Sequence, residues 1–215
     1  MQSNIISSPE LASQGQQKIE WVQRNMPILN QLEDQFAQER PFAGKRVTVC
    51  IHLEAKTAYL ALVLRAGGAT VSVTGSNPES TKDDVVAALA AEGLHVYARH
   101  GASPEEMRRY MSIALELQPH VVIDDGGDLV ELLHESQRQH GGQMLGACEE
   151  TTSGVLRARA RAKAGQLDFP VMLVNDARCK YLFDNVHGTG QSAWDAVMRS
   201  TNLVLAGKTV VIIGY

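Results

Sequence analysis

The spacing of apolar residues along the 215-residue chain changes after about residue 40. Before that point, Ser8-Pro9 and Met26-Pro27 are typical helix starts, because proline fits the first turn of a helix. The apolar residues after the second start are three and four positions apart: Ile28, Leu29, Leu32 and Phe36. This spacing places them on one face of a helix. The first 40 residues are therefore predicted to be helical.

From Arg46 onward, short β-branched runs alternate with longer helical stretches. The runs are 46–51, 70–74, 95–97, 121–123, 144–148 and 171–174. The helical stretches are 57–65, 83–91, 104–117, 129–137 and 153–164. Alternation at this spacing predicts an α/β fold, with a Rossmann-like, mostly parallel sheet, helices on both faces and right-handed crossovers.

Polar residues follow five of the six predicted strands. They are His52 to Thr57 after the first strand, Gly75 to Thr81 after the second, Asp124 to Asp128 after the fourth, Glu149 to Gly154 after the fifth, and Asn175 and Asp176 after the sixth. In an open parallel sheet, ligands bind beyond the carboxyl ends of the strands. We therefore expect a polar cleft along this rim.

Two pairs of charged residues on this rim could carry chemistry. Lys180 and Asp184 are four positions apart, so on a helix they would share a face. A lysine held by a carboxylate could polarise a substrate hydroxyl, although an ordinary surface ion pair has the same spacing. Asp124 and Asp125 are adjacent and point to opposite faces of a strand, so at most one of them enters the cleft. That carboxylate could act as a base, grip a ribose hydroxyl or cap a helix.

Three consecutive hydroxyl residues, Thr151, Thr152 and Ser153, precede a predicted helix. A helix cap accounts for one hydroxyl but not for three in a row. Hydroxyls at a helix start can also bind a phosphate or a nicotinamide carboxamide. These residues are therefore candidates for holding a cofactor.

The last apolar run, Lys208 to Tyr215, is a predicted strand that contains Gly214 near its end. This glycine could be the first of a dinucleotide-binding fingerprint, in which the chain turns so that a pyrophosphate can approach the next helix. It could also belong to an edge strand that ends in a turn.

Composition narrows the class of partner. The chain is 44% hydrophobic and 20% charged, and its formal charge of -4 is spread over interspersed residues. We expect small molecules and protein subunits as partners, not nucleic acid or a membrane, and a cytoplasmic protein. The cysteines are Cys50, Cys148 and Cys179, an odd number without a close pair, so neither a disulfide framework nor a metal site is expected.

Seven motifs, taken in order and spacing, resemble those of the adenosylhomocysteinase family from about Met26 to Tyr215. They are His52 to Thr57, Ser76-Asn77-Pro78, Ser80-Thr81, Asp124 to Asp128, Glu149 to Thr152, Lys180 with Phe183-Asp184-Asn185, and Ala206 to Tyr215. The resemblance implies a homotetrameric enzyme with tightly held NAD. It implies reversible hydrolysis of S-adenosyl-L-homocysteine to adenosine and homocysteine.

The resemblance also assigns roles to residues. Those implied in catalysis are His52, Asp125, Lys180, Asp184 and Asn185, and those implied in substrate binding are His52, Glu54, Lys56, Asp125, Glu150, Lys180 and Asp184. The residues implied in cofactor contacts are Thr151, Thr152, Ser153 and Asn185. By this likeness, oxidation of the ribose 3′-hydroxyl makes elimination of the thioether feasible, and Lys180 accepts or polarises the 3′-hydroxyl proton.

The resemblance suggests four segments. They are an N-terminal helical segment (1–25), a substrate-binding α/β domain (26–185), a connecting helix (186–207) and the first strand of a truncated NAD-binding Rossmann domain (208–215). We expect this chain alone not to turn over substrate. A non-catalytic module that binds a nucleoside or a partner is the alternative, and a hydroxy-acid dehydrogenase would not account for Lys180 to Asn185 with Glu150.

One motif departs from the family pattern. The animal and plant form has a threonine and a glutamate where this chain has Glu54 and Lys56. An ammonium only donates hydrogen bonds, so Lys56 suits the carbonyl of hypoxanthine better than the amino group of adenine. S-inosylhomocysteine is therefore an alternative substrate, unless Lys56 pairs with Glu54 or Glu79 and does not contact the base.

Overall fold

The computed structural model describes residues 3–213, and the chain divides into two compact units, Met1–Leu173 and Val174–Tyr215. The first unit contains the whole sheet and most of the helices. Among the described residues, no helix is long and apolar enough to cross a membrane.

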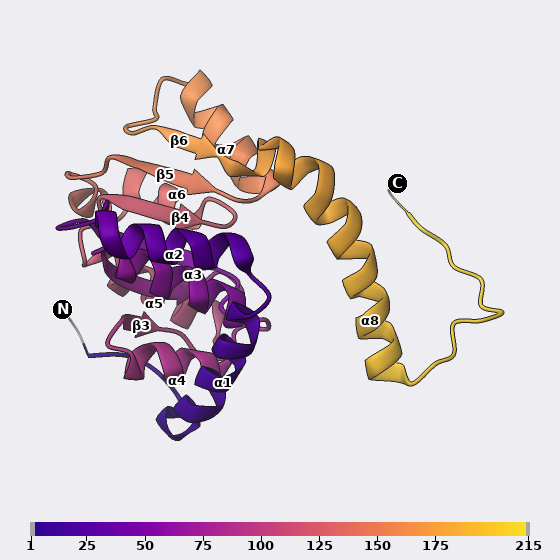
Figure 1. Cartoon of the computed structure of the whole chain (residues 1–215). Coiled ribbons are helices and arrows are strands. Elements are labelled where there is room, and N and C mark those ends of the chain that lie inside the picture. The colour runs from indigo at the N-terminus through magenta and orange to yellow at the C-terminus, as the bar shows by residue number, and fades with distance from the viewer. Residues whose placement is uncertain (1–2, 214–215) are drawn as a thin grey trace. The chain divides into compact units, whose positions relative to one another are not determined.

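The sheet has six strands in the order β3-β2-β1-β4-β5-β6, and every pair of neighbours is parallel (Figure 1). The strands are β1 (Arg46–Ile51), β2 (Thr70–Gly75), β3 (His95–Tyr97), β4 (Val121–Asp124), β5 (Gly146–Glu149) and β6 (Val171–Leu173). The predicted α/β fold with a Rossmann-like sheet is confirmed, and the six strands predicted between residues 46 and 174 are present.

Helices connect the strands and cover both faces of the sheet. They are α1 (Ala12–Gln23), α2 (Pro27–Glu39), α3 (Ala55–Ala66), α4 (Asp83–Ala91), α5 (Pro104–Leu115), α6 (Asp128–His134) and α7 (Thr152–Lys163), with short 3₁₀ segments η1 (Pro9–Leu11) and η2 (Arg138–His140). Local signals explain the starts, as at α5, where Ser103 and Glu106 form a capping box before the first turn. In Figure 1, α2 lies against α3.

Alternation along the strands divides the core into two clusters. Val47 and Val49 of β1 belong to a cluster with residues of α1, α3 and α4, whereas Cys50 belongs to a second cluster with residues of α5 and α6. Because successive strand residues point to opposite faces, the two clusters lie on opposite sides of the sheet. Burial on both sides holds the central strands rigidly, and this rigidity positions the loops at their ends.

The strand order reverses direction between β1 and β4. From β1 the chain adds strands outward to β3, and then crosses back to place β4 on the other side of β1. The loops that leave β1 and β4 therefore diverge and leave a crevice at the carboxyl end of the sheet. His52 follows β1 and Asp125 follows β4, so both candidates are placed at this switch point.

The second unit consists of η3 (Val174–Asp176), a π-helix η4 (Lys180–Thr189) and α8 (Gly190–Thr201). The predicted strand over residues 208–215 is wrong in its described part, because residues 208–213 form no strand. A strand needs a hydrogen-bonded neighbour, and none of the six parallel strands pairs with this run in the part of the chain that the structure describes. Gly214 and Tyr215 lie outside the described residues.

Candidate active site

His52 and Asp125 approach one another across the switch point. The Nε2 atom of His52 is 3.5 Å from Oδ2 of Asp125. The Asp125 side chain is only 10% exposed, whereas that of His52 is 53% exposed. An imidazole beside a shielded carboxylate can relay a proton between the carboxylate and a ligand in the crevice. The structure therefore brings together two residues that the family resemblance implies in catalysis.

Two serines from the loop after β2 complete this pair. The Ser76 hydroxyl donates to Oδ2 of Asp125 at 2.7 Å, and the Ser80 hydroxyl is 2.6 Å from Nδ1 of His52. Sequence reasoning noted both serines as parts of motifs but gave them no role. Their position just after a strand, on the polar rim, was the signal that could have found them.

A cavity of about 350 Å³ opens beside His52, and its walls combine charged and apolar residues. The lining includes four candidate substrate-binding residues, His52, Glu54, Lys56 and Glu150, and the apolar residues Met26, Leu29, Ile51 and Leu60. An apolar pocket with a few convergent polar groups is the usual form of a small-molecule site.

Glu54 and Lys56 both lie at the start of α3. Glu54 is the N-cap residue, and its Oε1 accepts a hydrogen bond from the Lys56 backbone N–H at 3.1 Å. Within residues 3–213, the Lys56 ammonium forms no ion pair with Glu54 or Glu79. The pairing that would have kept Lys56 away from the base is therefore absent from the described residues.

The hydroxyl residues after β5 form the start of α7. Thr151 is the N-cap: its Oγ1 accepts from the Gly154 N–H at 3.3 Å. Thr152 and Ser153 are exposed on the first turn. The expectation that a cap accounts for only one of the three hydroxyls is confirmed. The other two are placed where a carboxamide or phosphate could meet helix N–H groups.

Asp124 and Asp125 have opposite surroundings, as strand alternation predicted. Asp124 is fully buried, and its carboxylate accepts from the Asp125 N–H at 3.1 Å and the Val130 N–H at 2.9 Å. Burial, and to a smaller extent the charges of Glu149 and Asp128, raise the pKa of Asp124 to about 8. Only Asp125 is available to a ligand.

Lys180, in the second unit, is held by two amide oxygens. Its Nζ donates to Oδ1 of Asn175 at 2.6 Å and to Oδ1 of Asn185 at 2.8 Å, whereas Oδ2 of Asp184 is 3.9 Å away. The four-residue spacing predicts a helical pair of Lys180 with Asp184. In a π-helix, however, residues five apart come into register, so Asn185 is the closer partner. Asn175 was noted only as a polar residue after the sixth strand.

Among residues 3–213, no group of three or more His, Cys, Asp or Glu residues is arranged to hold a metal ion. The three cysteines are unpaired with one another, and burial raises the pKa of Cys50 well above its usual value.

Comparison with known proteins finds a matching family model and several similar proteins. A model of the S-adenosyl-L-homocysteine hydrolase family matches residues 4–145. An adenosylhomocysteinase of Pyrococcus abyssi is 53% identical over 95% of this chain and 49% of its own length. An S-inosyl-L-homocysteine hydrolase of Methanocaldococcus jannaschii is 50% identical over the same shares. The chain spans about half the length of the curated relatives it matches.

The family match and the relatives at about half identity agree with the seven motifs that indicated the same family. Those motifs contain His52 and Asp125, and they also contain the charged residues that line the cavity beside His52. The chain belongs to the S-adenosyl-L-homocysteine hydrolase family.

Proposed function

We propose that this chain is the nucleoside-binding portion of an enzyme that hydrolyses a nucleosidyl-homocysteine thioether, with S-adenosyl-L-homocysteine as the first candidate substrate. The products are the nucleoside and L-homocysteine, and the reaction is reversible. The observation that carries the proposal is the cavity that brings His52, Glu54, Lys56 and Glu150 together next to Asp125.

The cavity suggests a division of labour in binding. The apolar side chains of Met26, Leu29 and Leu60 suit the faces of a purine. Glu150, at the end of β5, suits the ribose hydroxyls, because a carboxylate accepts hydrogen bonds from two neighbouring hydroxyls. With the purine and ribose bound in this way, the 5′ substituent would lie toward the His52–Asp125 pair.

Proton transfer falls to three side chains. Lys180, oriented by Asn175 and Asn185, takes or polarises the proton of the ribose 3′-hydroxyl. Asp125 serves the 4′ position. His52, within 3.5 Å of Asp125, serves the leaving sulfur at the 5′ position. The Oδ2 atom of Asp184, 3.9 Å from the Lys180 ammonium, adds a negative charge beside it.

NAD is the cofactor that this proposal requires. Bound NAD would supply the hydride acceptor that oxidises the ribose 3′ position and so acidifies the 4′ proton. The residues fit such a group, because the exposed hydroxyls of Thr152 and Ser153 stand at the N-terminus of α7 beside the Thr151 cap. Asn185, whose Nδ2 donates to Thr189 at 3.3 Å, is the fourth cofactor-contacting candidate.

S-inosylhomocysteine is the second candidate substrate, and Lys56 is the observation that favours it. Lys56 lines the cavity without an ion pair to Glu54 or Glu79 within the described residues. Its ammonium can donate to the 6-carbonyl of hypoxanthine but cannot accept from the 6-amino group of adenine. The names of the relatives include both activities.

The partners proposed for the whole protein are small molecules and further copies of itself. The homotetramer implied by the family resemblance and the cytoplasmic location inferred from composition remain expectations. A mass measurement of the native assembly, together with a test for bound NAD, would examine the first of them.

The proposal is tested by titrating this chain calorimetrically with adenosine and inosine. We expect saturable binding of at least one nucleoside, and a Glu150→Ala variant should bind about tenfold or more weakly, because ribose hydroxyls lose a charged acceptor. Glu10→Ala, at an exposed position of η1, is the matched control. Absence of binding by wild-type chain, or equal binding by both variants, would count against the assignment.

A further inference from the structure

Glu149, the last residue of β5, has a buried carboxylate that accepts three hydrogen bonds on one oxygen. Glu149 is only 1% exposed. Its Oε1 accepts from the Gly126 N–H at 2.9 Å, from the Thr151 N–H at 3.0 Å and from the Thr151 hydroxyl at 2.7 Å. A buried oxygen with three donors fixes the positions of all three groups.

These donors come from the two loops that carry the ligand-facing carboxylates. Gly126 directly follows Asp125, and Thr151 directly follows Glu150. Gly126 has a φ of 103°, a conformation that glycine adopts readily, and this turn aims its N–H at Glu149. One carboxylate oxygen therefore joins the loop after β4 to the loop after β5.

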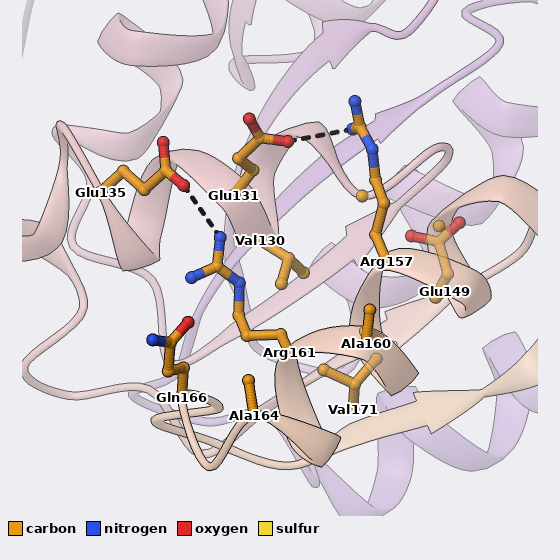
Figure 2. Close-up of a pocket in the computed structure, with 13 residues that line it drawn as sticks. Val130, Glu131, Glu135, Glu149, Arg157, Ala160, Arg161, Ala164, Gln166 and Val171 are labelled. Carbon is orange, nitrogen blue, oxygen red and sulfur yellow. Dashed lines mark hydrogen bonds and ion pairs between the residues drawn. The ribbon is translucent and has the colours of Figure 1, made fainter.

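The second carboxylate oxygen takes no part in this clamp. Within residues 3–213, Oε2 of Glu149 is buried and has no hydrogen-bond partner. Glu149 lines a cavity of about 380 Å³ between α6 and α7. Figure 2 shows that the side chains of Arg157 and Arg161, which line the same cavity, point away from Glu149. Arg157 pairs with Glu131 at 3.3 Å, and Arg161 pairs with Glu135 at 2.9 Å. In the part of the chain that the structure describes, no arginine pairs with Glu149.

Space for the clamp depends on Gly154 in the first turn of α7. A Cβ atom at this position would lie 2.1 Å from the carboxyl carbon of Glu149 and 2.3 Å and 2.4 Å from its oxygens. These separations are far below van der Waals contact, so any side chain there would displace the carboxylate. The glycine and the glutamate form one structural unit.

We propose that Glu149 is a positioning residue of the nucleoside site, which holds Asp125 and Glu150 in their working arrangement by joining their two loops. The effect on nucleoside affinity rests on the proposed function, whereas the joining of the loops does not. Glu149 acts through the acceptor Oε1 and not through its charge. A glutamine, whose amide oxygen can replace Oε1 and whose amide nitrogen can replace the unpartnered Oε2, therefore preserves the clamp.

The experiment compares this chain with its Glu149→Gln and Glu149→Leu variants by amide hydrogen exchange and nucleoside titration. In Glu149→Leu, we expect the Gly126 and Thr151 amides to exchange at least about tenfold faster and nucleoside affinity to fall by a similar factor, because the donors lose their acceptor. Glu149→Gln should stay within about threefold of wild type in both measurements. Wild-type protection and affinity in Glu149→Leu would overturn the proposal, as would a Glu149→Gln variant as impaired as Glu149→Leu.

A second variant covers the case in which Glu149→Leu does not fold. Gly154→Ala should also release the two amides, whereas Gly142→Ala, where an added Cβ meets nothing within 4 Å, is the matched control. Unchanged exchange in Gly154→Ala would overturn the clamp. If wild-type chain binds no nucleoside, the proposed function fails, and the exchange of Gly126 and Thr151 still decides whether Glu149 joins the loops.

Discussion

The candidate residues in the two units are held by contacts of different range. In the first unit, His52 meets Ser80, 28 positions away, and Ser76 meets Asp125, 49 positions away. In the second unit, Lys180 meets Asn175 and Asn185, each only five positions away. The first group exists only when the whole sheet is assembled. The second needs little more than one helix of the correct type, so the two groups should respond differently to substitution.

The largest effect is expected at Lys180, in a protein that carries the full length of the relatives. Lys180→Ala should lower kcat by about 10²- to 10⁴-fold, because it removes the group that acts on the 3′-hydroxyl. Bound NAD should be retained, because the cofactor has separate contacts. Steady-state kinetics and cofactor content of the purified variant measure both. Lys163→Ala, at the exposed end of α7, is the control, and more than about a tenth of wild-type activity would remove Lys180 from this role.

A smaller loss of activity is expected from substitution of Asn185 or Asp184, the two residues of η4 that lie near the Lys180 ammonium. Asn185→Ala removes a hydrogen bond to a charged group, typically about 1.5–3 kcal/mol, and should lower kcat/KM by about ten- to a hundredfold. Asp184→Ala removes an ion pair in which Nζ of Lys180 is 3.9 Å from Oδ2 of Asp184, and the Asp184 side chain is 59% exposed. This substitution should therefore lower kcat/KM by less than Asn185→Ala does. The kinetic constants of the two variants, measured in the same full-length protein, test this order. The reverse order would indicate that an ordinary helical i, i+4 pairing matters more than the π-helical register.

Lys56 tests purine choice in the first unit. If its ammonium reads the 6-position, Lys56→Glu should shift the ratio of kcat/KM for S-inosyl- to S-adenosylhomocysteine toward the adenine compound by about 1–3 kcal/mol. The two thioethers are compared under identical conditions with wild type and variant of a protein that carries the full length of the relatives. A ratio that does not change on substitution would mean that Lys56 does not contact the base.

The smallest effect is expected in the pH dependence of stability, which reports on the buried β4–β5 carboxylates. The pKa of Asp124 is raised to about 8, so the folded chain binds a proton there that the unfolded chain releases near pH 4. This contribution to stability is complete below about pH 4 and is lost as the pH rises toward 8. The ionisable groups that act on or respond to Asp124 are Glu149, Asp128 and the Cys50 thiol, and Asp125 contributes only its backbone N–H.

Asp124→Asn cannot titrate and should show a flatter dependence of thermal midpoint on pH. Calorimetry at pH 5 and pH 7.5 should find a decrease for wild type on the order of several degrees, and a smaller decrease for the variant. The amide also loses one acceptor, since its nitrogen cannot accept from the Val130 N–H, so its midpoint should be lower at pH 5. Parallel curves for the two proteins would show that Asp124 does not hold the proton.

Sequence patterns by themselves determined the alternation of strands and helices, the parallel sheet and most of the candidate residues. The β-branched runs and helix starts are local signals, and they identified every strand of the sheet and placed His52, Asp125 and Glu150 on its polar rim. Strand alternation also predicted that at most one of Asp124 and Asp125 enters the cleft, and the structure showed that Asp124 is the buried one. The motifs, not the periodicity, indicated the family.

The tertiary structure decided which of these residues act together. Ser76 and Ser80 received roles only when the loop after β2 was placed beside the loops after β1 and β4. The π-helical register of η4, which puts Asn185 rather than Asp184 nearest to Lys180, is not encoded in a four-residue spacing. The run 208–213 resembles a strand, yet strand formation requires a neighbouring strand as well as β-branched residues, because the backbone hydrogen bonds of a sheet lie between chain segments.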